Sequence, residues 1–234
     1  YSDNTNKTGS VQAFCYQVGD GTDGSPSSDH GYWGAPENQS GYNRSNMTLF
    51  TTDSMTATDI VSISACALAL HAYNFPNDAK SSQYLQTAKD LFAYAKSKAK
   101  TTYVVAQYAS DSWEDDYCSA AAALYLATGD TAYQIELNNH YGSVNTGWLL
   151  CWNKTWGIAS ALKGDWNATY SIAGYGSTTT AQGFKFIDGW GSCRYNTAEQ
   201  FLGLVYDKNK TTNSFGTWAT GQMKYILGNN NNKR

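Results

Sequence analysis

The sequence predicts an all-α protein, and three observations lead to this fold class. Apolar residues recur at steps of three and four over several long segments, which is the period of an amphipathic helix. Alanine is frequent on more than one face of these segments, as at residues 119–123, so neighbouring helices can pack closely on both sides. The alternation typical of a half-buried strand is scarce and is clearest at residues 103–107.

The first part of the chain, residues 1–54, shows no helical period. It holds Pro26 and Pro36, two of the three prolines, together with many glycines, and these residues favour turns. We therefore expect a loop region at 1–54 and a helical scaffold at 55–234. Functional sites are commonly built from long loops on a rigid scaffold.

The helical scaffold begins after Thr58 and Asp59, which are residue types that cap helix N-termini, and Pro76 marks the end of the first helix. A later helix ends at Gly129, a residue suited to a left-handed C-cap. We expect a long connection at 163–192. The helical period returns at residues 84–95, 117–128, 131–139, 148–162, 194–207 and 214–227.

The composition excludes several classes of protein. A chain of 234 residues can bury a sizeable core, and an aromatic content of 15% argues against disorder. Sixteen basic and nineteen acidic residues give a net charge of -3 without a basic run, so we expect no nucleic-acid partner. No apolar stretch approaches the roughly 20 residues that span a bilayer, and the polar start indicates a chain without a signal core. We expect no membrane span.

Acceptor sequences for N-glycosylation, Asn-x-Ser/Thr without a middle proline, occur seven times. This density is typical of a secreted, extracellular protein of a eukaryote, although a composition rich in Asn and Thr also produces such triplets by chance. We expect a secreted glycoprotein. The seven asparagines are Asn6, Asn38, Asn43, Asn46, Asn153, Asn167 and Asn209.

The five cysteines are widely spaced and form no Cys-x-x-Cys pair. An odd number leaves at least one thiol unpaired within the chain, and both disulfide pairing and burial as small apolar residues stay open for the others. The sequence has no Walker loop, no dinucleotide-binding glycine loop and no His-Glu-x-x-His motif. We expect no cofactor and no metal. The cysteines are Cys15, Cys66, Cys118, Cys151 and Cys193.

Five segments, taken in chain order, resemble glycoside hydrolase family nine, the inverting cellulases. They include a Trp-Gly-x-x-Arg-Tyr motif within 187–196 and a His and a Trp within 29–37. The resemblance covers nearly the whole chain. It implies an (α/α)6 toroid whose open end carries long loops and an aromatic-lined cleft for a β-1,4-glucan. The five segments are residues 17–21, 29–37, 124–130, 187–196 and 225–229.

The same resemblance also shows what this stretch lacks. The family places its catalytic base in an Asp-Ala-Gly-Asp motif upstream of the matched region and its catalytic acid, a Glu, near the far C-terminal end. Neither is present here. Residues 1–234 therefore resemble an incomplete catalytic domain, and we expect further polypeptide to complete the toroid. A fragment, one subunit of an assembly and a shortened non-catalytic relative are the three open accounts.

The resemblance implies four sugar-binding residues, and it implies no catalytic residue. His30 would donate hydrogen bonds to sugar hydroxyls and Trp33 would stack on the apolar face of a ring. Trp152 and Trp190 match further aromatic positions of the cleft. Without the motifs around them, a turn-capping His and buried Trp residues would be the simpler interpretation. Arg194 and the Tyr that follows it are expected to anchor the loop after Trp190.

The acidic run at residues 114–116 precedes an Ala-rich helix, where carboxylates cap free amides and favour the positive end of the helix. Capping is the expected role. Some members of the family bind calcium with carboxylates from this region and from the helix near Asp59. Residues 60–63 after Asp59 supply no second carboxylate, so we expect no calcium site of that kind.

The leading hypothesis is an endo-type hydrolase of β-1,4-glucan that acts with inversion, with its catalytic base and acid outside these 234 residues. The alternative is a non-catalytic extracellular protein that binds glucan or has a structural role. A third possibility is another sugar-active enzyme on a related helical toroid. The presence or absence of the two carboxylate motifs in flanking sequence separates the first two.

Overall fold

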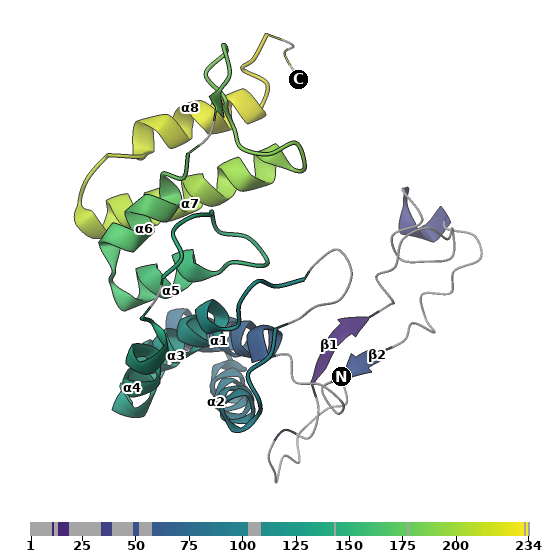
Figure 1. The fold of residues 1–234 in the computed structure, drawn as a ribbon, viewed down its shortest axis with the longest axis vertical. Helices are drawn as coiled ribbons and strands as arrows, with labels where there is room; N and C mark the ends of the chain where they lie inside the picture. The colour runs from purple at the N-terminus through teal and green to yellow at the C-terminus, as the bar shows by residue number, and fades with distance from the viewer. Residues whose placement is uncertain are drawn as a thin grey trace.

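A computed structural model shows a set of helical hairpins with two short β-hairpins (Figure 1). The structure describes residues 11, 14–18, 34–38, 49–51, 58–102, 109–142, 144–176, 178–231 and 233. The helices are α1 (Thr58–Asn74), α2 (Ser81–Ser97), α3 (Glu114–Thr128), α4 (Thr131–His140), α5 (Trp156–Lys163), α6 (Trp166–Ala173), α7 (Ser192–Lys210) and α8 (Gly216–Ile226).

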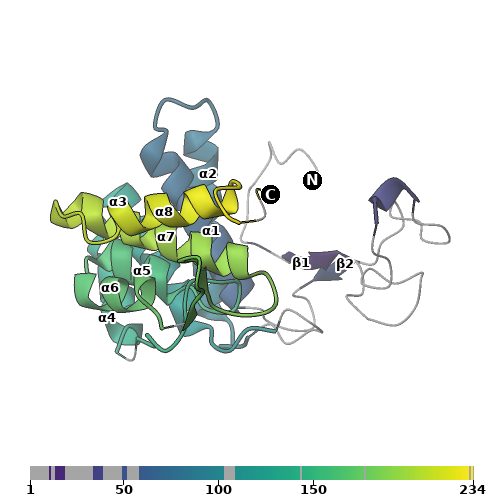
Figure 2. The ribbon, with the colours of Figure 1, turned by 90° about the horizontal axis from the view of Figure 1, so that it is seen from above.

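Two antiparallel pairs of strands and one short 3-10 helix, η1 (Pro36–Asn38), accompany the helices. The first pair joins β1 (Cys15–Val18) to β2 (Leu49–Thr51) and lies to one side of the helices (Figures 1 and 2). The second joins β3 (Thr178–Thr179) to β4 (Lys185–Phe186). Of the region predicted as loops, 1–54, the structure describes residues 11, 14–18, 34–38 and 49–51.

The helices alternate between two layers. The odd-numbered helices α1, α3, α5 and α7 contact one another in series, and each is followed by an even-numbered helix packed against it. This arrangement fits part of an (α/α)6 toroid. Figure 1 shows the resulting stack from α2 to α8.

The connections between helices are short at one end of the stack and long at the other. The turns that follow α1, α3, α5 and α7 are short, and Gly164 closes α5 with a φ of 81°, a conformation that a side chain would strain. The connections that lead into α3, α5 and α7 are long, namely 98–113, 141–155 and 174–191. In Figure 1 these long connections lie on the side nearer β1 and β2.

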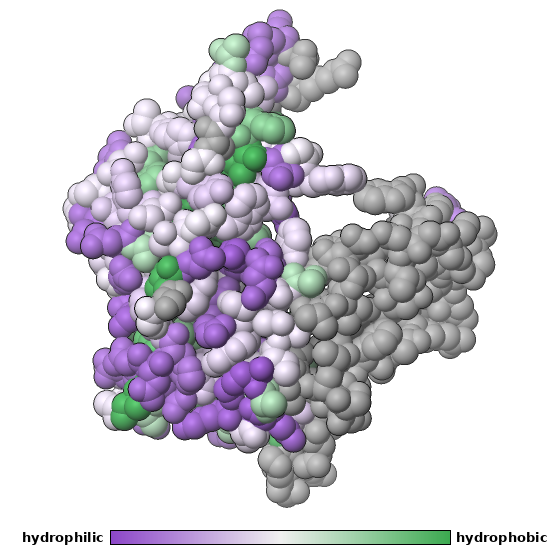
Figure 3. Space-filling view, viewed as in Figure 1, coloured by the Kyte–Doolittle hydropathy of each residue, from purple (hydrophilic) through white to green (hydrophobic). Residues whose placement is uncertain are grey.

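The core is centred on α3, which is enclosed on every side. All residues of α3 from Asp115 to Leu124 are buried, and Ala120 and Ala123 have no exposed surface. Small alanine side chains allow α1 and α5 to approach α3 closely on different faces. The predicted Ala-rich packing is therefore confirmed. The face drawn in Figure 3 is mostly hydrophilic over the described helices, with small separate apolar patches.

The sequence predicted seven of these helices, and three details were wrong. The segment predicted at 148–162 is helical only as α5, because residues 151–154 form a tight turn. The predicted connection at 163–192 contains α6, which Asp165 caps by accepting the Ala168 amide at 3.1 Å. Thr58 lies inside α1 and binds the Ala99 carbonyl rather than its own helix. The strand-like segment at 103–107 lies outside the described residues.

None of the helices in the described part of the chain is long and apolar enough to cross a bilayer.

Candidate functional site

Trp152 lies at the tip of a tight turn in the connection 141–155. The backbones of Cys151 and Lys154 bond to each other on both sides of the turn, at 3.0 and 3.2 Å. This pairing places the Trp152 indole outward, with 44% of the residue exposed. The turn replaces the helix expected at 148–155.

Arg194, in the first turn of α7, lies over the Trp152 ring. Its guanidinium carbon is 4.4 Å from the centroid of Trp152 and 4.0 Å from that of Tyr195. A planar cation over two rings gains cation–π attraction from each of them and restrains both. The sequence indicated an anchoring role for Arg194, and the structure assigns its contacts to the turn that carries Trp152.

Further aromatic rings continue this contact. Trp148 meets Tyr195 edge-on at 5.7 Å and Tyr175 at 5.2 Å. We call Trp152, Arg194, Tyr195, Trp148 and Tyr175 the aromatic row. The aromatic row joins three segments to one another: the connection 141–155, the connection 174–191 and the start of α7. Sequence analysis did not single out Trp148 or Tyr175, because neither lies in a family motif.

Trp190 belongs to the same end of the molecule and is the most open tryptophan among the described residues, at 79% exposure. Its amide donates to the Asp188 carboxylate at 2.8 Å. Gly191 follows with a φ of 75° and lets the chain enter α7 at once. An indole this exposed takes little part in packing the core and is accessible to a ligand. His30 and Trp33 lie outside the described residues.

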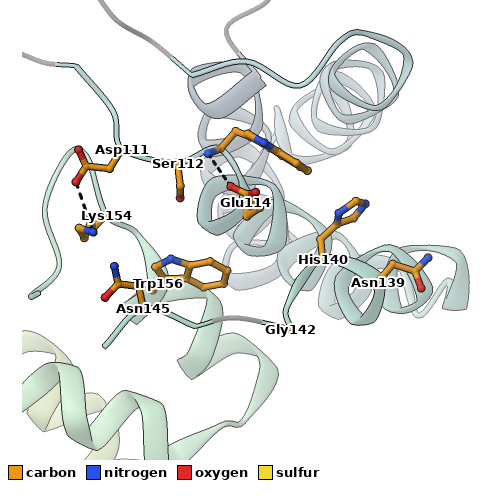
Figure 4. A pocket seen from close by; sticks show the side chains of 10 residues that line it. Asp111, Ser112, Glu114, Asn139, His140, Gly142, Asn145, Lys154 and Trp156 are labelled. Atoms are coloured by element: carbon orange, nitrogen blue, oxygen red, sulfur yellow. Dashed lines mark hydrogen bonds and ion pairs between the residues drawn. The ribbon is translucent and has the colours of Figure 1, made fainter. Parts of the chain in front are cut away.

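A pocket of about 510 Å³ opens beside the Trp152 turn (Figure 4). Asp111 and Lys154 form an ion pair on one side of it, 3.4 Å apart, and Asp111 also accepts a hydrogen bond from the Asn153 amide at 3.0 Å. Two indoles, an imidazole and several amides complete a lining suited to a polar ligand with an apolar face. The lining residues are Asp111, Ser112, Trp113, Glu114, Asn139, His140, Gly142, Asn145, Lys154 and Trp156.

Asp115 and Asp116 lie at the start of α3 and are buried. The Asp115 carboxylate accepts the Ser112 hydroxyl and the Thr155 amide, both at 2.6 Å, and Asp116 accepts the Thr155 hydroxyl at 2.7 Å. Burial raises the pKa of Asp116 well above its usual range, and the charges of Asp115 and Asp59 add to this effect.

These carboxyl groups hold the connection 141–155 against α3. Burial also raises the pKa of Asp115, against hydrogen bonds from Ser112, Thr155 and the first backbone amides of α3. The predicted capping role is therefore only part of their function. Among the described residues, no group of three His, Cys, Asp or Glu side chains is arranged to hold a metal ion.

Comparisons with known proteins assign the family. The sequence model of glycosyl hydrolase family 9 matches residues 4–234. This chain belongs to glycosyl hydrolase family 9. An endoglucanase of Dictyostelium discoideum is 28% identical and matches 94% of this chain but 33% of its own length. Endoglucanase 4 of Bacillus sp. (strain KSM-522) is 30% identical and matches 94% of this chain and 39% of its own.

Solved family 9 structures share the fold. The catalytic domain of Clostridium thermocellum CelT superposes with a TM-score of 0.82 at 33% identity, over 96% of this chain and 53% of that one. The cellulase Cel9M of C. cellulolyticum, solved in complex with cellobiose, gives 0.77 at 31% identity, over 94% and 54%. The chain thus spans about half the length of these solved relatives.

Proposed function

We propose that the protein to which this chain belongs hydrolyses internal bonds of β-1,4-glucan with inversion, and that this chain supplies part of its sugar-binding surface. Relatives named endoglucanases and a relative solved with cellobiose support the substrate class. The single observation that carries the proposal is the exposure of Trp152 and Trp190 at the end of the molecule where the long connections meet.

The chemistry of this end suits a glucan. The axial C–H groups of a β-glucosyl ring form an apolar face that packs on an indole, while its equatorial hydroxyls need polar partners. Trp152 is held by Arg194, and Asp111 and Lys154 lie in the pocket beside it. His30 and Trp33 are proposed to add one more subsite.

The catalytic base and acid are proposed to lie outside these 234 residues. Inversion needs two carboxyl groups roughly 6.5 to 9.5 Å apart, one on each side of the scissile bond. Asp115 and Asp116 are buried beneath the connection 141–155 and bound by Ser112 and Thr155. They therefore have no access to a sugar and do not replace such a pair.

The proposal extends to the domain organisation, the secretion and the glycosylation of the protein. Residues 1–234 form an incomplete catalytic domain, with cleft loops at 1–54 and the helical scaffold at 55–234. Further polypeptide completes the toroid, and the protein is secreted and carries N-linked glycans. The exposed side chains of Asn38, Asn167 and Asn209 are compatible with glycans, and Asn6, Asn43 and Asn46 lie outside the described residues.

The test separates binding from hydrolysis. Isothermal titration of the purified chain with cellohexaose is expected to show binding that weakens in Trp152→Ala and Trp190→Ala, with no release of reducing sugar. Phe75→Ala, an exposed aromatic in a short turn at the other end, is the matched control. The full-length protein is expected to hydrolyse soluble cellulose derivatives. Binding by the full-length protein without hydrolysis would instead support the non-catalytic alternative, and hydrolysis by the isolated chain would contradict the proposed location of the carboxyl pair.

A further inference from the structure

Lys185 and Glu199 form a buried ion pair that the proposed sugar contacts do not involve. The Lys185 ammonium lies 2.9 and 2.8 Å from the two carboxylate oxygens of Glu199. The Glu199 side chain has no exposed surface, and that of Lys185 is 14% exposed. The pair joins β4 to the middle of α7, fourteen positions apart in the sequence.

The Lys185 ammonium has two further contacts. It donates to the Tyr175 carbonyl and lies over the Trp218 ring of α8, 5.6 Å from the centroid. An ammonium group has three donors and no acceptor, so a carboxylate, a carbonyl and a ring face satisfy it from three directions. One side chain thereby links two parts of the connection 174–191, at Tyr175 and at Lys185, to α7 and α8.

The backbone of Lys185 is held as firmly as its side chain. Its amide donates to the Gln222 side chain at 2.8 Å, and its carbonyl accepts from Asn196 at 3.0 Å. Gln222 in turn donates to the Gly183 carbonyl at 2.9 Å. In Figure 1 the hairpin of β3 and β4 lies beside α8 and α7, as these bonds require.

This anchored segment leads to the sugar-binding residues in both directions. Trp190 follows Lys185 by five positions on the same connection. Tyr175, whose carbonyl binds Lys185, packs its ring on Trp148 in the aromatic row. A shift of the Lys185 segment therefore moves Trp190 and one end of the aromatic row together.

We propose that Lys185 and Glu199 are positioning residues: they fix the connection 174–191 on α7 and α8 and so set the place of Trp190 and of the Tyr175–Trp148 contact. This inference rests on the proposed sugar-binding function only for its consequence in glucan affinity. Glu199 is buried in full, so the pair acts through the connection and not by contact with a sugar.

An ion pair suits this role better than it suits stability. Removing two charges from water offsets most of their attraction, so an apolar pair of similar volume is often as stable. Directional contacts of the ammonium with Glu199 and Tyr175, however, permit one arrangement of the connection, whereas apolar side chains permit several.

The experiment uses the double variant Lys185→Met/Glu199→Leu, which leaves no buried charge unpaired. Indole N–H resonances of tryptophan-labelled chain, assigned by single Trp→Phe variants, report each ring at pH 8. We expect the resonances of Trp190 and Trp148 to move, and those of Trp113 and Trp156 to stay. Affinity for cellohexaose is expected to fall by about fivefold, the size of an ordinary coupling between neighbouring groups.

A second, more exposed ion pair in another part of the fold provides the control. Lys96 and Glu136 join α2 to α4 at 2.9 Å, and Glu136 also accepts the Tyr117 hydroxyl. Lys96→Met/Glu136→Leu is expected to move the Trp113 resonance and to leave Trp190 unchanged. Single variants Lys185→Met and Glu199→Gln test whether one partner alone holds the segment.

The outcomes of the experiment are distinct. Wild-type resonances of Trp190 and Trp148 in a folded double variant would overturn the positioning role, whatever the glucan affinity. If the unmodified chain binds no cello-oligosaccharide, the proposed function fails instead, while moved resonances would still support the role of the ion pair in placing Trp190.

Discussion

Arg194 shows how one side chain restrains the orientation of an exposed ring, that of Trp152. Its guanidinium lies over the rings of both Trp152 and Tyr195, and each cation–π contact is worth about 0.5 to 1 kcal/mol at a partly exposed site. Trp152 is therefore oriented in advance, which would lower the entropy lost if it binds a sugar as proposed.

Arg194→Lys should weaken cellohexaose binding by about threefold, because an ammonium group is not planar and cannot stack on two rings. The unfolding midpoint in urea should change little. Titration calorimetry measures the first effect and circular dichroism the second. Unchanged affinity would mean that Trp152 is oriented by its turn alone.

Glu199 should make stability depend on pH near neutrality. Burial raises its pKa from 4.5 to about 7, although the hydrogen bond and charge of Lys185 oppose the rise. The folded state thus holds this proton more tightly than the unfolded state. The resulting stabilisation of the folded state is complete below pH 4.5 and is lost as the pH rises through 7, on the order of 3 kcal/mol in total.

Melting temperatures measured from pH 5 to pH 8 check this expectation. Glu199→Gln, which does not titrate, should show a flatter profile over that range than the unmodified chain. Parallel profiles for the two proteins would show that Glu199 has an ordinary pKa.

The sequence could indicate residues that lie in motifs, but not contacts between distant residues. Trp152 and Trp190 could be proposed as sugar contacts because each lies in a recognisable segment, and the structure shows that both are exposed. The pair Lys185–Glu199 was not found, because a Lys in a connection and a Glu in a helix read as solvated charges. Only the fold brings them together beneath Tyr175.

At the scale of elements, α7 and α8 pack through a glycine. A Cβ atom on Gly203 would lie 2.6 to 2.8 Å from the ring and Cβ of Phe215. Gly203→Ala should therefore displace Phe215 and destabilise the chain by about 1 to 3 kcal/mol, measured by urea unfolding. Gly221→Ala, where a Cβ meets nothing within 4 Å, is the control and should be neutral or stabilising.

The start of α8 depends on one carboxylate. Asp207, 6% exposed, accepts the amides of Ser214, Phe215 and Gly216 at 2.8 to 2.9 Å and the Thr212 hydroxyl at 2.7 Å. Burial opposes its ionisation, but these four donors outweigh burial and lower its pKa.

Asp207→Ala should cost about 2 kcal/mol or more, since it leaves three helix-end amides without an acceptor. Urea unfolding followed by circular dichroism measures the loss. The free energy of unfolding of Asp207→Asn, which keeps one acceptor oxygen, should lie between that of Asp207→Ala and that of the unmodified chain. An alanine variant as stable as the unmodified chain would mean that water replaces the carboxylate without loss.

Element boundaries were predictable where local signals determined them. Gly129 ends α3 and Pro76 follows α1, as the sequence indicated. The turn at 151–154 was not predictable, because the residue that follows it, Thr155, is held by hydrogen bonds to Asp115 and Asp116, which are distant in the sequence. Helix α6 is too short for its period to stand out, although its cap, Asp165, was a usable signal.

At the scale of the whole molecule, the exposed sequons give a test of secretion. In a eukaryotic secretory host, Asn167 and Asn209 should carry glycans, because both side chains are exposed. Asn153 should have the lowest occupancy of the three, since it is only partly exposed and its side-chain amide donates to the Asp111 carboxylate. Glycopeptide mass spectrometry with and without deglycosylation measures each site. Full occupancy at Asn153 would show that glycosylation precedes the folding of this turn.

The family resemblance supplied the large-scale prediction that composition could not. Helical periods alone indicate an all-α chain, and the toroid followed from motifs in family order. The two-layer alternation of odd and even helices is the packing expected of part of such a toroid.

The separation of short turns and long connections has a practical consequence. A surface anchor or fused reporter attached at residues 75–80 would meet only a compact, exposed hairpin corner. The opposite end, with Trp152 and Trp190, would remain free to face an insoluble fibre. Oriented immobilisation through this corner is therefore the natural way to test whether the chain adheres to solid cellulose.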